Sequence, residues 1–131
     1  MADKITFDLV SPERLLLSQP VDMVTIPGSE GYMGVMAGHM ALVSTLRAGM
    51  IDMLNDGGNT RFFIMGGFAE INASKVIVLA EEAIPMTELD LAVLDQRIKD
   101  AQDDEIAAKT DAARLKASQL VDDLKLVRAV F

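Results

Sequence analysis

The hydrophobic periodicity of this 131-residue chain changes once, near Pro85, and the change separates two kinds of structure. From Lys4 to about Ile84, apolar residues recur at every second position, which is typical of antiparallel strands. Beyond Pro85 there is no glycine, and apolar residues recur at steps of three and four, which indicates amphipathic helices. We therefore expect a β domain over residues 1–85 and a helical domain over residues 86–131.

The first domain is predicted to consist of many short strands separated by turn residues. Ile5, Phe7 and Leu9 alternate with polar neighbours, as in a strand with one buried face. The sequence Asp-Gly-Gly-Asn at 56–59 predicts a β-hairpin, since glycine and asparagine accept the positive φ of a tight turn. Many short strands with close turns favour a flattened sandwich or barrel of two antiparallel sheets. Later strand-like runs are expected at 50–54, 61–65, 69–71 and 76–79.

The second domain is predicted to be a helical hairpin. Thr87 is the expected N-cap of its first helix, with Asp90 three residues later. An acidic stretch, Asp103-Asp104-Glu105, interrupts the apolar stripe, and Asp103 or Asp104 is expected to cap a second helix that begins near Ile106. The two stripes are expected to face each other in an antiparallel pair. The expected seam consists of Leu94, Ile98, Ala101, Ala113, Ala117, Leu120 and Leu124.

The alanines of this seam allow close approach of the helices but bury little apolar area. A hairpin with so small a seam is expected to be marginally stable alone. We therefore expect it to be able to dock on the sandwich, separate from it or extend along a partner.

Composition excludes several classes of function. The chain carries 12 basic and 20 acidic residues, a net charge of -8, and its basic residues are scattered, so nucleic acid is not an expected partner. The lack of cysteine removes disulfides, thiolate zinc sites and cysteine nucleophiles. No apolar run approaches the ~18 residues of a membrane span, and no signal-like start is present, so direct membrane insertion is not expected.

Residues able to carry chemistry are few. His39 is the single histidine, and one imidazole without a cysteine cannot make a convincing metal site. Glu81 and Glu82 are adjacent, so their side chains are expected to point to opposite faces of a strand rather than act as a pair. Gly66-Gly67 indicates a bend or a close approach of backbones, since neither a lysine nor a helix start follows it. We expect no catalytic residue, no metal and no cofactor.

An ordered set of short segments carries a family resemblance. The chain resembles the epsilon subunit of bacterial F-type ATP synthases, the counterpart of the mitochondrial delta subunit. The resemblance implies a non-catalytic subunit at the foot of the central stalk, on the cytoplasmic face of the inner membrane. The segments that carry it are Phe-Asp-Leu-Val-Ser-Pro-Glu at 7–13, Pro-Gly-Ser-Glu-Gly at 27–31, Gly34-Val35, Gly38-His39, Gly-Met-Ile at 49–51, Gly-Gly-Phe-Ala-Glu at 66–70 and Val-Leu-Ala-Glu at 78–81.

The resemblance also implies two partners for the sandwich and a mechanical role. The sandwich grips the gamma subunit and touches the polar loops of the c-ring, so that rotation of the ring is passed to gamma and drives ATP synthesis. The family usually has a proline where Ala41 stands, and its absence loosens the backbone there. The implied c-ring contact is Ser29, Glu30, Gly31 and Tyr32, in a glycine-bracketed turn, and the implied gamma interface is His39, Met40, Ala41 and Leu42.

In some family members the hairpin extends toward the alpha and beta catalytic subunits and blocks hydrolysis, and in some it binds ATP. ATP-binding members share an Ile/Leu-Asp-x-x-Arg-Ala stretch in the first helix. Here Val93 stands at the arginine position after Leu89-Asp90, and in Leu94-Asp95-Gln96-Arg97 the arginine comes one residue too early. One residue rotates a helical side chain by roughly 100°, so ATP binding is not expected. Inhibition by the hairpin is left open by the sequence.

A second class of function also fits the composition, namely a free-standing β-sandwich adaptor with a helical oligomerisation arm. Gel filtration with gamma separates the two, because a stalk subunit forms a stable complex and an adaptor does not. An enzyme is disfavoured, since no nucleophile, base and metal constellation is present.

Overall fold

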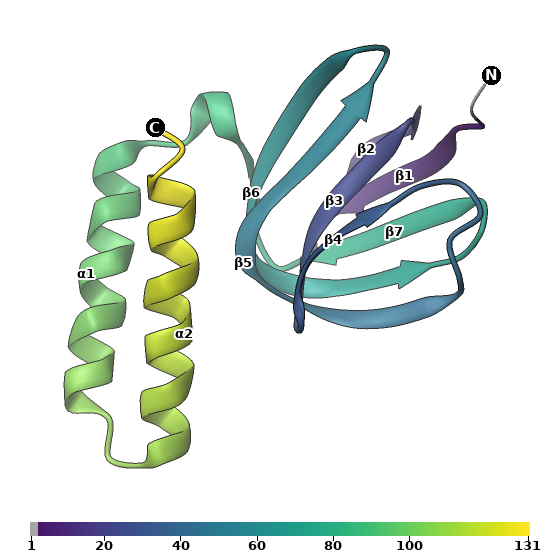
Figure 1. Ribbon diagram of the computed structural model, residues 1–131. Helices are drawn as coiled ribbons and strands as arrows, with labels where there is room; N and C mark the ends of the chain where they lie inside the picture. The colour runs from purple at the N-terminus through teal and green to yellow at the C-terminus, as the bar shows by residue number, and fades with distance from the viewer. Residues whose placement is uncertain (1–2) are drawn as a thin grey trace. The chain divides into compact units, whose positions relative to one another are not determined.

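The computed structural model describes residues 3–131 and divides them into two compact units, one ending at Met86 and one spanning Thr87–Phe131. The first unit contains eight strands and the second two helices (Figure 1). A short 3-10 helix, Met86–Glu88, lies at the boundary. The predicted fold class, a β-sandwich followed by a helical hairpin, is confirmed.

The strands follow the order β2-β1-β7-β6-β5-β3-β4, with β8 also paired to β6. The two longest strands, β5 and β6, curve strongly, so that the sheet folds over on itself (Figure 1). Each of these two strands therefore contributes to both layers of the sandwich. The strands are β1 (Ile5–Val10), β2 (Leu15–Val21), β3 (Met23–Gly28), β4 (Gly31–Val35), β5 (Leu42–Asn55), β6 (Gly58–Ile71), β7 (Lys75–Ala80) and β8 (Ala83–Pro85).

One pair of neighbouring strands is parallel, which differs from the expectation of purely antiparallel sheets. β1 lies beside β7, with Phe7 opposite Val76 and Leu9 opposite Val78. The other pairs between strands are antiparallel. Alternation of apolar residues is the same for either strand direction, so the sequence pattern could not reveal this pairing.

The core of the sandwich follows the alternation. Ile5, Phe7 and Leu9 have no exposed surface, whereas the residues between them are partly exposed. Full burial of such a side chain contributes about 1.5–3 kcal/mol. Strands near the two opposite ends of the sheet order, β1 and β3, contribute fully buried residues to this single core, which joins the two layers.

The predicted hairpin turn joins β5 to β6. Asp56 and Gly57 have φ values of 52° and 81°, the left-handed conformation that a two-residue turn needs. Lys4 fixes the start of β1 to this turn through Asp56, at 2.8 Å, and through Asn55. The hydrogen bond to Asp56 raises the pKa of Lys4 above its ordinary value.

Two glycines bend β6 in its middle, as their sequence predicts. Gly66 and Gly67 have φ values of 113° and 145°. A Cβ on Gly67 would lie 2.1 Å from the carbonyl oxygen of Leu79, so β6 and β7 approach too closely for any side chain there. The runs expected separately at 61–65 and 69–71 are therefore one bent strand.

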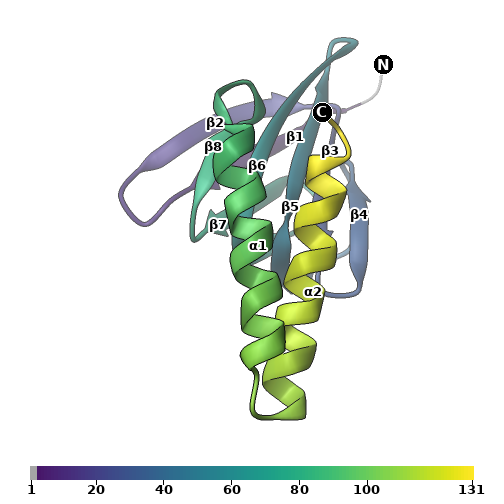
Figure 2. The same cartoon turned by 90° about the vertical axis from the view of Figure 1, so that its left-hand side faces the viewer.

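The second unit is an antiparallel pair of helices, α1 (Leu91–Ala107) and α2 (Asp111–Arg128), which lie side by side (Figure 2). The predicted caps are wrong. Asp90 caps α1, accepting the amide of Ala92 at 2.9 Å, and Thr110 caps α2, accepting that of Ala113 at 3.0 Å. Asp103 and Asp104 lie inside α1, and Thr87 lies in the 3-10 helix. Several polar residues near each helix start have side chains that could cap the helix. Asp90 and Thr110 are the caps because each stands directly before its helix with an extended backbone.

The interior of the hairpin differs in part from the expected seam. Leu94, Ala101, Ala117 and Leu124 are buried, and Ile98 and Leu120 are partly exposed. Ala113 is exposed, whereas Val127 is buried, and so is Val121, which the apolar stripe did not include. An ion pair of 2.8 Å between Arg128 and Asp95 joins the end of α2 to the start of α1.

Candidate interaction surfaces

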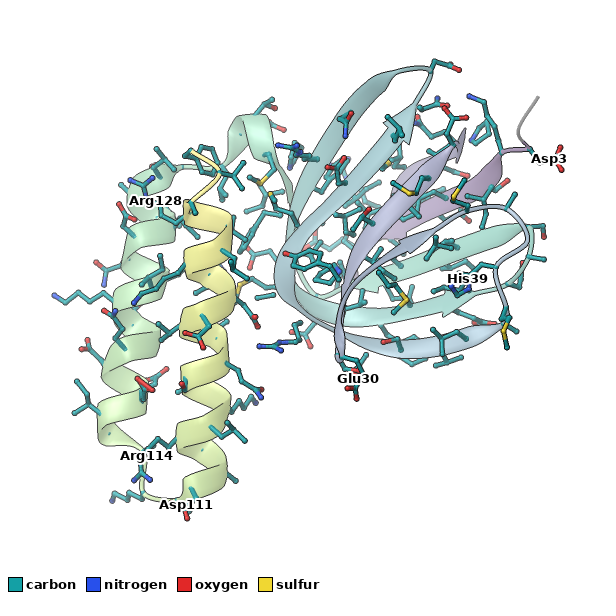
Figure 3. All side chains as sticks on the ribbon, viewed as in Figure 1. Asp3, Glu30, His39, Asp111, Arg114 and Arg128 are labelled. Carbon is teal, nitrogen blue, oxygen red and sulfur yellow. The ribbon has the colours of Figure 1, made fainter. Side chains whose placement is uncertain are left out.

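The turn between β3 and β4 carries the residues expected to contact the c-ring. Gly28 pairs with Gly31, whose φ is 127°, and Ser29 and Glu30 form the exposed tip between them. Figure 3 shows Glu30 projecting from the end of this hairpin. The turn is formed as the glycines predict, and it presents a carboxylate to solvent.

Tyr32, the fourth residue of this set, behaves differently from the others. Its hydroxyl oxygen accepts a hydrogen bond from the backbone amide of Met50 on β5, at 3.1 Å. The side chain is 47% exposed, and its hydroxyl group is bonded to β5. Tyr32 therefore differs from Ser29 and Glu30 in that its polar group contacts the sheet.

The loop between β4 and β5 carries the residues expected to contact gamma. His39 is partly buried, and its Nδ1 donates to the carbonyl of Met40 at 2.7 Å, which makes it a hydrogen-bonded loop residue. Met40 is 82% exposed, and Ala41 and Leu42 are also exposed. Gly38, with a φ of 89°, donates its amide to Ala73 at 2.8 Å and ties the loop to the β6–β7 turn.

An exposed apolar strip crosses the outer face of the sandwich beside this loop. The strand register places Phe68 opposite Leu79, Leu79 opposite Val10, and Val10 opposite Leu15. Four members of the strip, Leu15, Val43, Phe68 and Leu79, are exposed large hydrophobic residues. Sequence reasoning missed the strip because alternation shows which residues share a face but not which face is left uncovered. The apolar strip consists of Leu15, Val10, Leu79, Phe68 and Val43.

A groove of about 550 Å³ brings parts of the two predicted sites together. Ser29 and Glu30 line it from the turn, and Leu42, Val43 and Phe68 line it from β5 and β6. His39, Met40 and Ala41 do not line it. The acidic turn and the end of the apolar strip are therefore neighbours on one folded unit.

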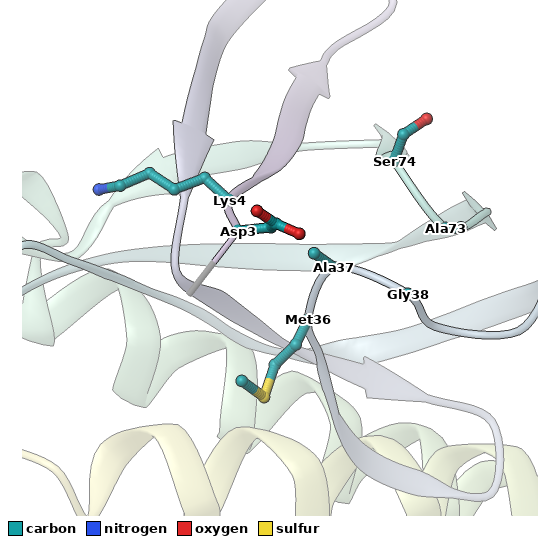
Figure 4. A pocket seen from close by; sticks show the side chains of 7 residues that line it. All are labelled: Asp3, Lys4, Met36, Ala37, Gly38, Ala73 and Ser74. Carbon is teal, nitrogen blue, oxygen red and sulfur yellow. The ribbon is translucent and has the colours of Figure 1, made fainter. Parts of the chain in front are cut away.

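A second hollow, between the start of β1 and the loops at residues 36–38 and 73–74, contains the carboxylate of Asp3, with no second charged group facing it. Figure 4 shows the amine of Lys4 and the hydroxyl of Ser74 pointing away from its centre. Lys4 binds Asp56 instead. Over residues 3–131 no cluster of His, Cys, Asp or Glu could hold a metal ion. In the same stretch no helix has the length and apolar character of a membrane span.

Asp8 forms a polar cluster next to the apolar strip. Its carboxylate accepts a hydrogen bond from Ser18 at 2.6 Å and pairs with Lys75 at 3.1 Å. The Ser18 hydroxyl, and after it the Lys75 ammonium, hold the pKa of Asp8 below its ordinary value. The side chain is only 15% exposed, so these contacts are partly shielded from water.

Asp8→Asn is expected to remove a pH-dependent part of the stability. Because the folded pKa of Asp8 is lowered, its contribution is fully present above about pH 4 and is lost as the pH falls through the folded value. At pH 7 the variant is expected to be less stable by about 1 kcal/mol. The gap should close toward pH 2, as measured by urea unfolding at a series of pH values. A gap that stays constant with pH would contradict the assignment.

The chain is similar in sequence to ATP synthase epsilon chains over nearly its whole length. The family model of the delta/epsilon chain of ATP synthase, β-sandwich domain, matches residues 4–86. The ATP synthase epsilon chain of Parvibaculum lavamentivorans is 51% identical over 98% of this chain and 98% of its own length. That of Maricaulis maris is 45% identical, covering 99% and 98%.

Chains of two solved mitochondrial ATP synthase structures have a fold similar to that of this chain. A chain of the Euglena gracilis mitochondrial ATP synthase matches with a TM-score of 0.80 and 27% identity, covering 99% of this chain and 82% of that one. A chain of the Tetrahymena thermophila mitochondrial ATP synthase, from a structure of its central stalk and c-ring, matches with a TM-score of 0.72, covering 97% and 98%. Its 15% identity makes this second match a likeness of fold alone.

Proposed function

The chain belongs to the ATP synthase delta/epsilon family and is a non-catalytic stalk subunit of that enzyme, and we propose that it couples c-ring rotation to the gamma subunit. The observation that carries this proposal is that one sandwich presents two exposed surfaces, an acidic turn and an apolar strip. A subunit that transmits torque has to contact each of its two neighbours through one rigid domain. The long paired strands β5 and β6 make the sandwich rigid, since they run through both layers.

The c-ring is proposed to contact the β3–β4 turn through Ser29, Glu30 and Gly31. The exposed carboxylate of Glu30 can pair with a basic group on a polar loop of the ring. Charge complementarity of this kind fixes register and speeds association. The contact implies that the subunit works at the cytoplasmic face of the membrane, bound through the complex.

Gamma is proposed to cover the apolar strip together with His39, Met40, Ala41 and Leu42. Contiguous apolar surface on a soluble domain commonly marks a protein interface. The flexible thioether of Met40 suits such a surface, and Leu42 continues it toward the groove.

The alpha and beta catalytic subunits are proposed partners of the free end of the hairpin. Ile106 and Leu115 are 84% and 60% exposed there. Lys109 and Lys116 add positive charge, and Arg114 is paired with Asp111 at 2.9 Å (Figure 3). Because the acidic residues 103–105 lie at the same end, charge attraction to an acidic surface would be weak, and the exposed apolar residues would carry most of such a contact.

Two charge substitutions are expected to affect different partners. Leu79→Asp places a charge in the apolar strip and should weaken gamma binding at least about tenfold, since an unpaired charge is costly to bury. Glu30→Lys should weaken ring binding by about tenfold and leave gamma binding unchanged. Surface plasmon resonance with purified gamma and with the detergent-solubilised c-ring measures both affinities. Thr60→Asp, on β6 outside both surfaces, is the control.

The proposal fails if the unaltered chain binds neither partner. It also fails in part if each variant weakens both contacts equally, because the two surfaces would then not be separate. Gel filtration of the chain with gamma gives an independent result, since a stable complex should elute earlier than either component.

A further inference from the structure

We infer that Tyr32 is a positioning residue that latches the β3–β4 hairpin to β5 and thereby fixes the direction of Glu30. This inference rests on the proposed ring contact. It assigns Tyr32 a role within the sandwich in place of the direct contact expected for it.

Beyond a gap in its pairing with β5, the β3–β4 hairpin is held to the sheet at one residue of β3, Gly28, which pairs with Leu46. β4 is an edge strand, bonded only to β3. The pairing of β3 with β5 shifts register between Thr25 and Gly28. Pro27 lies within that shift and has no amide to donate. The pairing of β3 with β5 is therefore interrupted over Ile26 and Pro27 and resumes only at the base of the turn.

Tyr32 spans this interruption. It pairs with Pro27 on β3, and its phenol reaches over β3 to β5. There the hydroxyl oxygen accepts the amide of Met50 at 3.1 Å, which supplies a partner to a backbone donor beside the register shift. The aromatic side chain thus replaces a missing ladder contact.

Gly49 supports this reading independently. A Cβ at this position would lie 2.5 Å from the hydroxyl oxygen of Tyr32 and 3.0 Å from Cβ of Pro27. The φ of Gly49 is not in the left-handed region, so backbone conformation does not require glycine here. The space that glycine leaves is the space that Tyr32 and Pro27 occupy.

If Tyr32 holds the hairpin to β5, removing its hydroxyl oxygen should have a local effect. Tyr32→Phe should raise the exchange rate of the Met50 amide and weaken c-ring binding, each by about two- to tenfold, the range expected for one net hydrogen bond. Gly49→Ala should do the same by displacing the ring of Tyr32. Gamma affinity and exchange of core amides such as that of Phe7 should be unchanged. Gly34→Ala is the matched control, since it adds a methyl group to β4 whose nearest neighbour is the flexible thioether of Met23, at 3.3 Å.

The experiment uses the full chain, with amide exchange read by NMR and ring binding by surface plasmon resonance. Unchanged Met50 exchange in Tyr32→Phe overturns the latch, even if ring binding weakens, because Tyr32 would then touch the ring directly. Should Gly49→Ala fail to fold, Tyr32→Phe alone decides. If Glu30→Lys leaves ring binding intact, the ring contact itself is wrong. The latch is then judged by Met50 exchange and by the mobility of a spin label at Ser29, which Tyr32→Phe should increase.

Discussion

Gly67→Ala is expected to lower the free energy of unfolding of the sandwich by more than about 4 kcal/mol, or to prevent folding. The added Cβ would lie 2.1 Å from the carbonyl oxygen of Leu79 and 2.9 Å from Cα of Ala80. Both are backbone atoms of the paired strand, so no side-chain rotation relieves the clash. The φ of 145° adds strain of about 1–3 kcal/mol for any residue with a side chain. Urea unfolding followed by circular dichroism measures the loss.

Gly58→Ala is the control for this change. It lies on the same strand, and the nearest atom to its added Cβ is the carbonyl oxygen of Asn55 at 3.7 Å. Its stability is expected to stay within about 1 kcal/mol of the unaltered chain. Equal effects of the two substitutions would show that β6 and β7 do not approach at Gly67.

Leu124→Ala is expected to unfold the helical hairpin while the sandwich stays folded. Leu124 has no exposed surface, and Leu94 is the only other leucine fully buried among residues 87–131. Loss of such a side chain costs about 2–5 kcal/mol, which exceeds the stability that a two-helix seam rich in alanine and valine can supply. Helical signal at 222 nm and amide exchange over residues 88–131 measure the result.

Leu126→Ala is the matched control, because the same atoms are removed from the same helix at a site that is 59% exposed. The free energy of unfolding of the hairpin is expected to stay within about 0.5 kcal/mol of that of the unaltered chain. If Leu124→Ala raises exchange in the sandwich as much as in the hairpin, the two units unfold together. The hypothesis of an independently labile hairpin would then be wrong.

The proposed function depends on surface rather than on reactive groups. The contacts proposed for the ring and for gamma consist of an exposed turn, a loop and an apolar strip, all carried by one core. Substitutions in the core should therefore alter coupling only through stability, whereas surface substitutions should alter it through affinity.

The sequence by itself determined the two-part organisation and much of the local structure. Alternation over Ile5, Phe7 and Leu9 was enough to assign a strand with one buried face, because successive side chains of a strand must point to opposite sides. The turn at Asp56 and Gly57 and the bend at Gly67 followed from the positive φ that only a few residues accept. The family resemblance followed from the order of its short segments.

The tertiary structure alone decided what depends on residues far apart in the chain. The parallel pairing of β1 with β7, the exposure of the apolar strip and the bond from Tyr32 to Met50 all join distant segments. The caps at Asp90 and Thr110 depend on where an extended backbone meets the start of a helix. Several polar residues were equally suited to this role by their chemistry, so the sequence could not select among them. A local hydrophobic pattern in the sequence indicates which residues share one face of a strand or helix. Which neighbour covers that face is set by the packing of the whole core.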